Sequence, residues 1–294
     1  MTSTMTGSGV GDLPRTYLYV PGNAGAKLAG ALGRGADAVI VDLEDAVPLA
    51  EKDVARDGVV AWIRSLPADL GAQVWVRVNA GPLRDADVAA LAGLPGLTGL
   101  ALAKVESRDD VEAVAAQLSA AGDETSLLMP LVESAVAVLA VREIASGPRV
   151  HQLQIGEVDL AGDLGITPGD DEVEMLTTRT MVVIASVAAG IVPPVGPVSR
   201  ITADPEALRT STERVQRLGF VGRACIHPAQ LAVVHEVFTP SVDEVDDAQT
   251  VLRLLDEAEA AGSGVVLDGQ GRLVDPAVLV GAQRTLALAK RAGH

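Results

Sequence analysis

Short apolar runs that end in polar residues alternate along the chain with Ala-rich stretches whose apolar residues recur every three to four positions. The short runs are typical of buried parallel strands, and the longer stretches have the period of amphipathic helices. The runs predict eight strands, over residues 16–21, 38–44, 73–79, 99–105, 126–133, 150–159, 191–198 and 223–227. The helices between them are predicted over 24–33, 52–65, 85–92, 108–121, 135–146, 173–189 and 205–218.

This alternation predicts an α/β chain folded as a closed (β/α)8 barrel. An open doubly wound sheet is the alternative, but such a sheet rarely needs eight units. The segment that opens the first helix, residues 21–25 (PGNAG), contains glycine but lacks the G-x-G-x-x-G spacing of a dinucleotide site. The barrel is therefore the preferred prediction.

The barrel is expected to occupy residues 15–240. Residues 1–14 are rich in Gly, Ser and Thr and are predicted to form a disordered leader. Residues 241–294 exceed what a barrel needs and are predicted to form a C-terminal helical extension, with helices over 243–261 and 276–292. Such an extension can serve as a lid or as an arm that reaches a neighbouring subunit.

Composition narrows the possible partners. The chain carries a net charge of −16, which disfavours nucleic acids and anionic membranes because both need a basic face. The basic residues Arg15, Lys27, Arg34, Lys52 and Arg56 nevertheless gather in the first 56 positions. They suggest a site for an anionic ligand, with ordinary solvated side chains as the alternative.

Two features bear on the compartment. The single cysteine, Cys225, allows no intrachain disulfide, so a reducing cytoplasm is expected. The longest apolar stretch, residues 181–198, is interrupted by Gly190, Pro193, Pro194, Gly196 and Pro197, which would break a membrane helix.

The candidate chemistry lies at the predicted strand ends. Glu133 and Asp159 each close a predicted strand, so parallel neighbours would bring both to one edge of the sheet. Two oxygen donors with no Cys or His nearby suit a hard cation such as Mg2+, with Mn2+ as an alternative. Other strands end in Glu44 and Asp45, in Arg77 and in Lys104, and this repetition predicts a metal-assisted active site.

The chain resembles the HpcH/HpaI aldolase/citrate lyase family, and within it the proteins similar to the citrate lyase beta subunit. The resemblance extends over about residues 14–290 and rests on motifs that occur in the family's order. They are residues 15–22 (RTYLYVPG), 35–47 (GADAVIVDLEDAV), 76–79 (VRVN), 131–134 (LVES), 156–160 (GEVDL) and 225–230 (CIHPAQ).

The resemblance implies a (β/α)8 barrel with a C-terminal extension, assembled as a homotrimer or hexamer. It implies Mg2+-dependent cleavage or formation of a carbon–carbon bond in a 3-hydroxyacyl-CoA thioester such as malyl-CoA, citramalyl-CoA or citryl-CoA. The other product would be a small 2-oxo acid: glyoxylate, pyruvate or oxaloacetate.

The resemblance also implies roles for residues. Glu133 and Asp159 match the metal ligands, and Arg77 matches the arginine that binds the substrate carboxylate and keto oxygen. Asp275 resembles the catalytic acid that the extension supplies to a neighbouring subunit; a helix N-cap before Pro276 is the alternative.

Glu44 and Asp45 are expected to orient Arg77 or metal-bound water, with a simple turn as the alternative. Coenzyme A, as part of the substrate, is expected near the loop after the first strand. The residues implied for it are Arg15, Pro21, Gly22, Lys27, Lys52 and Arg56. The chain departs from the family pattern at Glu157 and Val158, where Ala and Glu are more usual, and at Gly196-Pro197.

Several alternatives stay open at this point. The same site could hydrolyse a malyl-CoA-type thioester, or act as a lyase subunit on a citryl group carried by a partner protein. Lys104 at a strand end could instead form a Schiff base. A non-catalytic CoA-binding scaffold is disfavoured by the retained acids and Arg77. His227 is expected to be structural and Cys225 to be packed in the barrel, so a Cys–His nucleophile is disfavoured.

Overall fold

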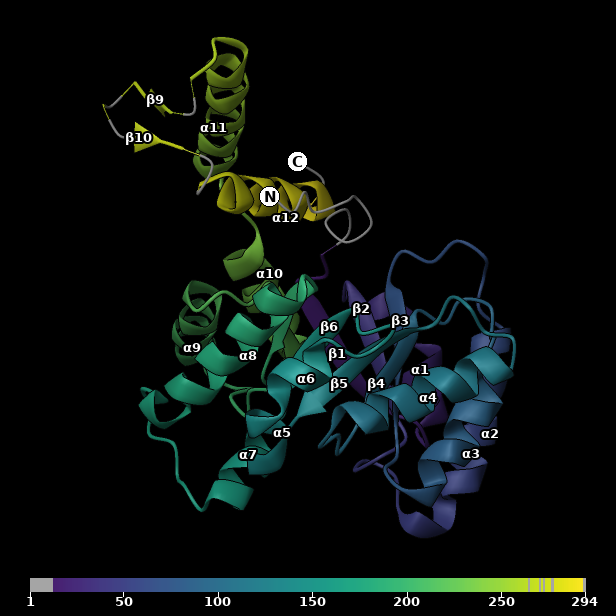
Figure 1. Cartoon of the computed structure of the whole chain (residues 1–294). Helices are drawn as coiled ribbons and strands as arrows, with labels where there is room; N and C mark the ends of the chain where they lie inside the picture. Colours follow the sequence, from purple (N-terminus) through teal and green to yellow (C-terminus); the bar gives the residue numbers. More distant parts are fainter. Residues whose placement is uncertain (1–12, 264, 270, 272, 276–277, 293–294) are drawn as a thin grey trace.

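Eight parallel strands close into a barrel within residues 13–263 (Figure 1). The computed structural model describes residues 13–263, 265–269, 271, 273–275 and 278–292. Each strand pairs with the next, and β8 pairs back with β1, where Thr16 is opposite Arg223. The strands are β1 (Thr16–Pro21), β2 (Ala38–Asp42), β3 (Gln73–Val78), β4 (Gly99–Leu102), β5 (Leu127–Val132), β6 (Gln152–Ile155), β7 (Val192–Gly196) and β8 (Gly222–Cys225). The predicted (β/α)8 fold is confirmed.

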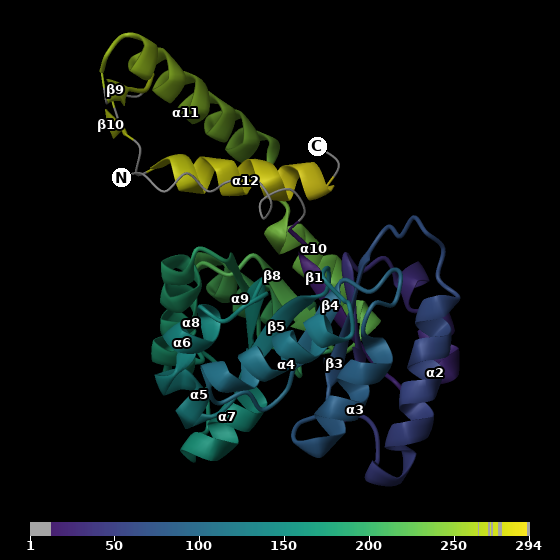
Figure 2. The same ribbon diagram turned by 45° about the vertical axis from the view of Figure 1, so that its right-hand side comes forward.

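Helices cover the outside of the barrel (Figure 2). They are α1 (Gly25–Ala29), α2 (Lys52–Arg64), α3 (Pro82–Leu91), α4 (Arg108–Ala120), α5 (Ala135–Leu139), α6 (Val141–Ala145), α7 (Glu157–Leu164), α8 (Leu176–Ala189), α9 (Pro205–Arg217) and α10 (Leu231–Phe238). Short 3-10 turns η1 (Leu32–Arg34), η2 (Leu49–Glu51), η3 (Val173–Met175) and η4 (Pro228–Gln230) lie in the connections.

The strands alternate between two cores, as their period of two requires. Outward side chains such as Val39, Val76 and Leu128 pack against the helices in the larger core. Inward side chains such as Tyr17 and Trp75 fill the barrel interior. The interior becomes polar toward the carboxyl ends of the strands, where the inward positions hold the side chains of the pocket described below.

The C-terminal extension crosses the amino-terminal end of the barrel. It comprises α11 (Val242–Ala260), a ribbon of β9 (Val266–Leu267) and β10 (Leu273–Val274), and α12 (Leu279–Ala292). Nη2 of Arg291 in α12 donates to the carbonyls of Asp37 and Gly71, which precede β2 and β3, at 3.1 Å each. Both views show α11 and the ribbon projecting away from the barrel (Figures 1 and 2).

The start of the described chain packs against this extension. Leu13 is buried in a cluster with Val192, Val221, Ala287 and Leu288. The predicted leader therefore cannot include Leu13, whose burial gives it a fixed place; residues 1–12 lie outside the described residues. In the described part of the chain, no helix has the length and apolarity needed to cross a membrane.

Candidate active site

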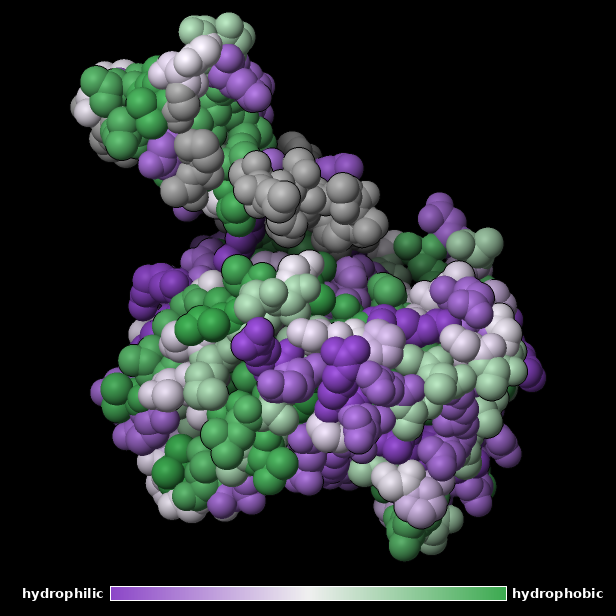
Figure 3. All heavy atoms as spheres, viewed as in Figure 1, coloured by the Kyte–Doolittle hydropathy of each residue, from purple (hydrophilic) through white to green (hydrophobic). Residues whose placement is uncertain are grey.

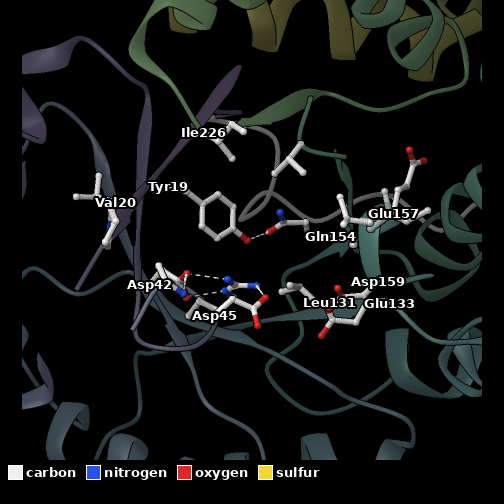
Figure 4. A pocket seen from close by; sticks show the side chains of 17 residues that line it. Tyr19, Val20, Asp42, Asp45, Leu131, Glu133, Gln154, Glu157, Asp159 and Ile226 are labelled. Carbon is white, nitrogen blue, oxygen red and sulfur yellow. Dashed lines mark hydrogen bonds and ion pairs between the residues drawn. The ribbon is translucent and has the colours of Figure 1, made fainter. Parts of the chain in front are cut away.

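A cavity of about 350 Å³ opens at the carboxyl ends of the strands, the end opposite α12 (Figure 4). Its lining comes from residues at or just after these ends: Tyr19, Val20, Pro21, Asp42, Asp45, Ala46, Arg77, Leu131, Glu133, Gln154, Ile155, Gly156, Glu157, Val158, Asp159, Val198 and Ile226. Because βα loops at this end carry the active sites of (β/α)8 enzymes, the cavity is the candidate active site.

Two carboxylates converge in this cavity. Glu133 directly follows β5 and is almost fully buried, whereas Asp159 is partly exposed. Nζ of Lys104 lies 3.5 Å from Oε1 of Glu133 and forms an ion pair with Oδ2 of Asp159. One cationic group therefore reaches both acids, so the two carboxylates lie close together, as expected from the sequence.

Asp159 does not end a strand, however, and that part of the prediction is wrong. Strand β6 ends at Ile155, and Asp159 lies in the first turn of α7. Gly156 connects the two elements and passes so close to Glu133 that a Cβ atom there would lie 2.7 Å from Cβ of Glu133. Only glycine leaves room for the acid at this position.

Lys104 contacts the two acids through its backbone as well as its side chain. Its φ angle of 53° is in the left-handed region, which is uncommon for a residue with a side chain. Its backbone N–H donates to Oε1 of Glu133 at 2.6 Å. Burial alone would lower the pKa of the Lys104 amine, but the contact with Asp159 and the charge of Glu133 raise it. The side chain is thus a bound ammonium ion, which disfavours a Schiff base.

Arg77 forms the second part of the site. Its Nε and Nη2 donate to the two carboxylate oxygens of Asp42, at 2.7 Å each. The two residues are direct neighbours across β2 and β3, so parallel pairing creates the fork. Nη1 lies 3.0 Å from Glu44 and 3.4 Å from Asp45, and the guanidinium lies over the Tyr19 ring at 5.2 Å. Because Asp42 occupies the fork, Nη1 is the atom that faces the other acids.

Asp42, Tyr19 and Gln154 were not singled out from the sequence as site residues. Tyr19 donates its hydroxyl proton to Oε1 of Gln154 at 3.0 Å, and burial raises the pKa of Tyr19. Period-two alternation could have found all three, because residues 17 and 19, 40 and 42, and 152 and 154 share the inner face. Asp42 is the last residue of β2 and lies directly beside Arg77 of β3, so it contacts the fork. Glu44 approaches Arg77 from the loop after β2.

Glu44 has an unusual proton affinity. Burial of its side chain, together with a side-chain hydrogen bond to the carboxylate of Asp45 and the charge of Asp45, raises the pKa of Glu44 to about 7, although Arg77 and Lys104 oppose the shift. Burial outweighs the 3.0 Å ion pair with Arg77, because the guanidinium of Arg77 is already paired with Asp42. Glu44 and Asp45 do lie beside Arg77, as predicted for residues that orient it.

Three of the predicted coenzyme A contacts have other partners. Arg15 lies at the amino-terminal end of β1, away from the cavity, and pairs with Asp37 at 2.8 Å. Nζ of Lys52 donates to the carbonyls of Leu43 and Glu44, at 2.6 Å each. Arg56 pairs with Asp53 and Asp87, again at 2.8 Å. Clustering of charge in the sequence did not reveal these partners, which disfavour a phosphate-binding role for the three residues.

The other predicted contacts are better placed. Pro21 lines the cavity, and Gly22 packs so closely that a Cβ atom would lie 2.9 Å from the carbonyl oxygen of Asp42. Lys27 is exposed on α1, at the same end of the barrel. The loop after β1 therefore stays the candidate for the coenzyme A side of the site.

His227 and Cys225 are structural. Nδ1 of His227 accepts a hydrogen bond from the backbone of Ala229 and caps η4. Cys225 is buried, and burial raises the pKa of its thiol to about 12. A thiol that stays protonated at neutral pH is a poor nucleophile. Neither residue lines the cavity.

Asp275 lies between β10 and α12 in the extension. The extension lies at the amino-terminal end of the barrel, and the cavity is at the carboxyl end. The chain's own Asp275 is therefore remote from its own cavity. The alternative of a helix cap involves Pro276, which lies outside the described residues.

The donor set fits a hard divalent cation. Burial raises the pKa of Glu133, and the charge of Asp159 adds to this shift. A cation near both oxygens would offset that repulsion, as Lys104 does. Among the described residues, no group of three or more His, Cys, Asp and Glu side chains could hold a metal. Two carboxylates would leave coordination positions for water and substrate, as Mg2+ sites commonly do.

Comparisons with known proteins show the family of the chain. The model of the HpcH/HpaI aldolase/citrate lyase family matches residues 15–228. A (3S)-malyl-CoA thioesterase of Cereibacter sphaeroides is 37% identical over 281 residues, covering 94% of each chain. The citrate lyase subunit beta of Leuconostoc mesenteroides is 33% identical over 287 residues, covering 94% of this chain and 93% of the relative.

A solved structure is similar over nearly the full length. The CitE protein of Mycobacterium tuberculosis, in complex with magnesium, acetoacetate and coenzyme A, has a TM-score of 0.74 and 28% identity. The match covers 95% of this chain and 98% of that one.

Proposed function

Because the chain belongs to the HpcH/HpaI aldolase/citrate lyase family, we propose that it is a Mg2+-dependent carbon–carbon lyase acting on a 3-hydroxyacyl-CoA thioester. Malyl-CoA, citramalyl-CoA and citryl-CoA are the candidate substrates, with glyoxylate, pyruvate or oxaloacetate as the 2-oxo acid. The observation that carries the proposal is the convergence of Glu133 and Asp159 on one cationic position, with Arg77 in the same cavity.

The reaction needs a metal site, a cationic group for the substrate and a proton donor. Glu133 and Asp159 would hold the metal, which when bound polarises the hydroxyl and carboxylate oxygens of the substrate. Arg77 stays charged, because the bond to Asp42 raises its pKa despite burial. Its Nη1, which lies beside Glu44 and Asp45, is the atom that would bind a carboxylate of the substrate. The hydroxyl then gives up its proton to solvent and becomes the carbonyl of the 2-oxo acid, as the bond between its carbon and the carbon beside the thioester breaks. The electron pair of that bond forms the thioester enolate, which takes up a proton.

We propose that Asp275 of the partner subunit supplies this proton, or removes it in the reverse direction. The remote position of Asp275 from its own cavity supports a contribution in trans. Exposed apolar residues on the α5 and α8 side of the barrel, Leu139, Ile184 and Val187, also support assembly (Figure 3). A homotrimer or hexamer, as proposed from the family, would satisfy both observations.

Mixed assemblies test the trans arrangement. Glu133→Gln and Asp275→Asn each inactivate the sites that contain them, but a co-expressed mixture combines intact halves from different subunits. With random assembly, about a quarter of the sites should recover, since half the barrels and half the arms are intact. A mixture that stays as inactive as its two components would refute the exchange of Asp275 between subunits.

Hydrolysis is the second candidate function, and the thioesterase relative of 37% identity favours it. The discriminating assay supplies purified enzyme with malyl-, citramalyl- and citryl-CoA, with and without Mg2+, and measures both 2-oxo acid and free thiol. Lyase activity releases 2-oxo acid, whereas hydrolysis releases thiol without it. Release of neither product from any of the three would favour a carrier-protein substrate, as expected for a citrate lyase subunit.

The metal assignment has its own control. Glu133→Gln should abolish turnover and leave the circular dichroism spectrum unchanged. Glu143→Gln, an exposed position on α6, should retain activity. EDTA should inactivate the wild-type enzyme, and added Mg2+ should restore it. Full activity of Glu133→Gln would remove the metal site from the proposal.

A further inference from the structure

A buried arginine holds the first turn of α7 through Glu157, which lies at the wall of the cavity. Arg179 of α8 has a side chain that is only 2% exposed. Its Nε and Nη2 donate to the two carboxylate oxygens of Glu157, at 2.5 and 2.7 Å, and its Nη1 donates to Glu172 at 2.8 Å. This planar fork fixes the direction of Glu157 as well as its distance, which a lysine would not do.

The arginine is itself anchored to the barrel. Glu172 accepts a hydrogen bond from Ser211 of α9 at 2.7 Å. Ser211 in turn accepts one from Nη2 of Arg223 in β8 at 3.0 Å, and Nε of Arg223 donates to the carbonyl of Pro197 at 3.0 Å. Side chains from α8, α9 and β8 thus form one buried polar network that ends at Glu157. Such networks favour a single arrangement when their members are all bonded.

Glu157 and Asp159 share the first turn of α7 but face different ways. Residues two apart in an α-helix point about 200° apart around the axis. Glu157 accordingly points away from Glu133 and Asp159 (Figure 4). The N-cap of α7 is Gly156, which offers no side-chain cap. Two polar side-chain contacts hold this turn: Lys104 bonds to Asp159, and the fork of Arg179 bonds to Glu157.

We propose that Arg179 and Glu157 are positioning residues that set the place of Asp159 relative to Glu133, and thereby the affinity of the site for its divalent cation. The inference rests on the proposed function, in which both acids bind Mg2+. It also gives a role to Glu157, which stands where Ala is more usual in the family pattern: its carboxylate accepts the two hydrogen bonds from Arg179.

Calorimetric titration of the full-length protein with Mg2+ tests the inference without substrate turnover. Loss of a residue that orients a metal ligand typically weakens binding about 10–100-fold, and we expect this for Arg179→Met. Arg179→Lys and Glu157→Gln, which disturb packing less, should each weaken binding severalfold and keep the test valid if Arg179→Met does not fold. The double variant Glu157→Gln/Arg179→Met should bind no more weakly than Arg179→Met, because both changes break the same contact.

Arg149→Met is the matched control. Nη2 of Arg149 donates to the carbonyl of Asp123 at 2.6 Å and to Ser119 at 2.8 Å, at the amino-terminal end of the barrel. This variant should lower the melting temperature and leave the Mg2+ dissociation constant within about twofold of wild type, as expected for a distant, independent site. If Arg179 had a purely structural role, Arg179→Met would likewise lower the melting temperature and leave the Mg2+ dissociation constant unchanged, and the proposal would be refuted.

The outcomes separate the two proposals. If wild-type protein binds no Mg2+, the proposed function fails. If wild-type protein binds Mg2+ and the variants at 179 and 157 bind equally well, only this inference is overturned. Additive effects of the two substitutions would also overturn it, since Arg179 would then act by a route other than Glu157.

Discussion

Asp42 is the buried acid on which the geometry of Arg77 depends, and Asp42→Asn removes its charge while keeping its shape. The carboxylate accepts hydrogen bonds from Nε and Nη2 of Arg77, and from the backbone N–H groups of Glu44 at 2.9 Å and Ala46 at 3.1 Å. The amide retains one acceptor oxygen, but its NH2 group would face a guanidinium donor. Arg77 would then lose the partner that occupies its fork.

The expected cost follows from burial. Asp42 is 3% exposed and Arg77 is 9% exposed, so water cannot replace the lost partner. Removing one member of a buried ion pair costs about 3–5 kcal/mol. Because asparagine keeps one hydrogen bond, we expect a loss of about 3 kcal/mol in the free energy of unfolding. With a urea m-value of about 3 kcal/mol/M, the unfolding midpoint should fall by about 1 M.

Urea unfolding at a fixed protein concentration measures this loss, and Asp45→Asn is the control. Asp45 also lies near Arg77, at 3.4 Å, but its side chain is 60% exposed. An exposed ion pair contributes at most about 1 kcal/mol, so its midpoint should move little. Equal midpoints for the two variants would refute the view that Asp42 is the dominant partner of Arg77.

Three further predictions concern the same cavity. Gly156→Ala would place a Cβ atom 2.8 Å from Oε2 of Glu133, so it should weaken Mg2+ binding about 10-fold in calorimetric titration, whereas Gly162→Ala, with open space around it, should not. Because the pKa of Glu44 is raised from about 4.5 to about 7, the folded state binds more protons than the unfolded state between these values. Wild-type stability should therefore fall as pH rises through that window relative to Glu44→Gln, and parallel unfolding curves would contradict it. Because the ammonium of Lys104 is held by Glu133 and Asp159, borohydride with pyruvate or glyoxylate should leave no adduct on Lys104 by mass spectrometry; a reduced adduct would restore the Schiff-base mechanism.

The sequence predicted the barrel well because strand length and helix period are local properties of the chain. It also placed Glu133 and Arg77 correctly, since each belongs to the end of its strand. It misplaced Asp159, because the apolar residues at 153, 155 and 158 do not reveal that the strand stops at Ile155. The turn there depends on the close approach of Gly156 to Glu133, a contact between two elements.

Charged residues were harder to assign than strands. Arg15 and Arg56 look alike in sequence as candidate anion-binding residues, yet each pairs with an aspartate, Asp37 and Asp87, 22 and 31 positions away. Composition gives the number of charges, but only tertiary structure gives their partners. Asp42 was overlooked for the opposite reason: it is internal to its strand pattern, and its importance appears only when β3 brings Arg77 alongside.

The closure of the barrel has a consequence for how the chain folds. β1 finds its second neighbour only in β8, so Thr16 pairs with a residue as distant as Arg223, and the carbonyls of Asp37 and Gly71 bond to Arg291. Contacts between such distant positions slow folding and leave unpaired edges open to other molecules meanwhile. Refolding from denaturant should therefore be slow and sensitive to protein concentration, and nascent chains should benefit from chaperones until the eighth strand has been synthesised.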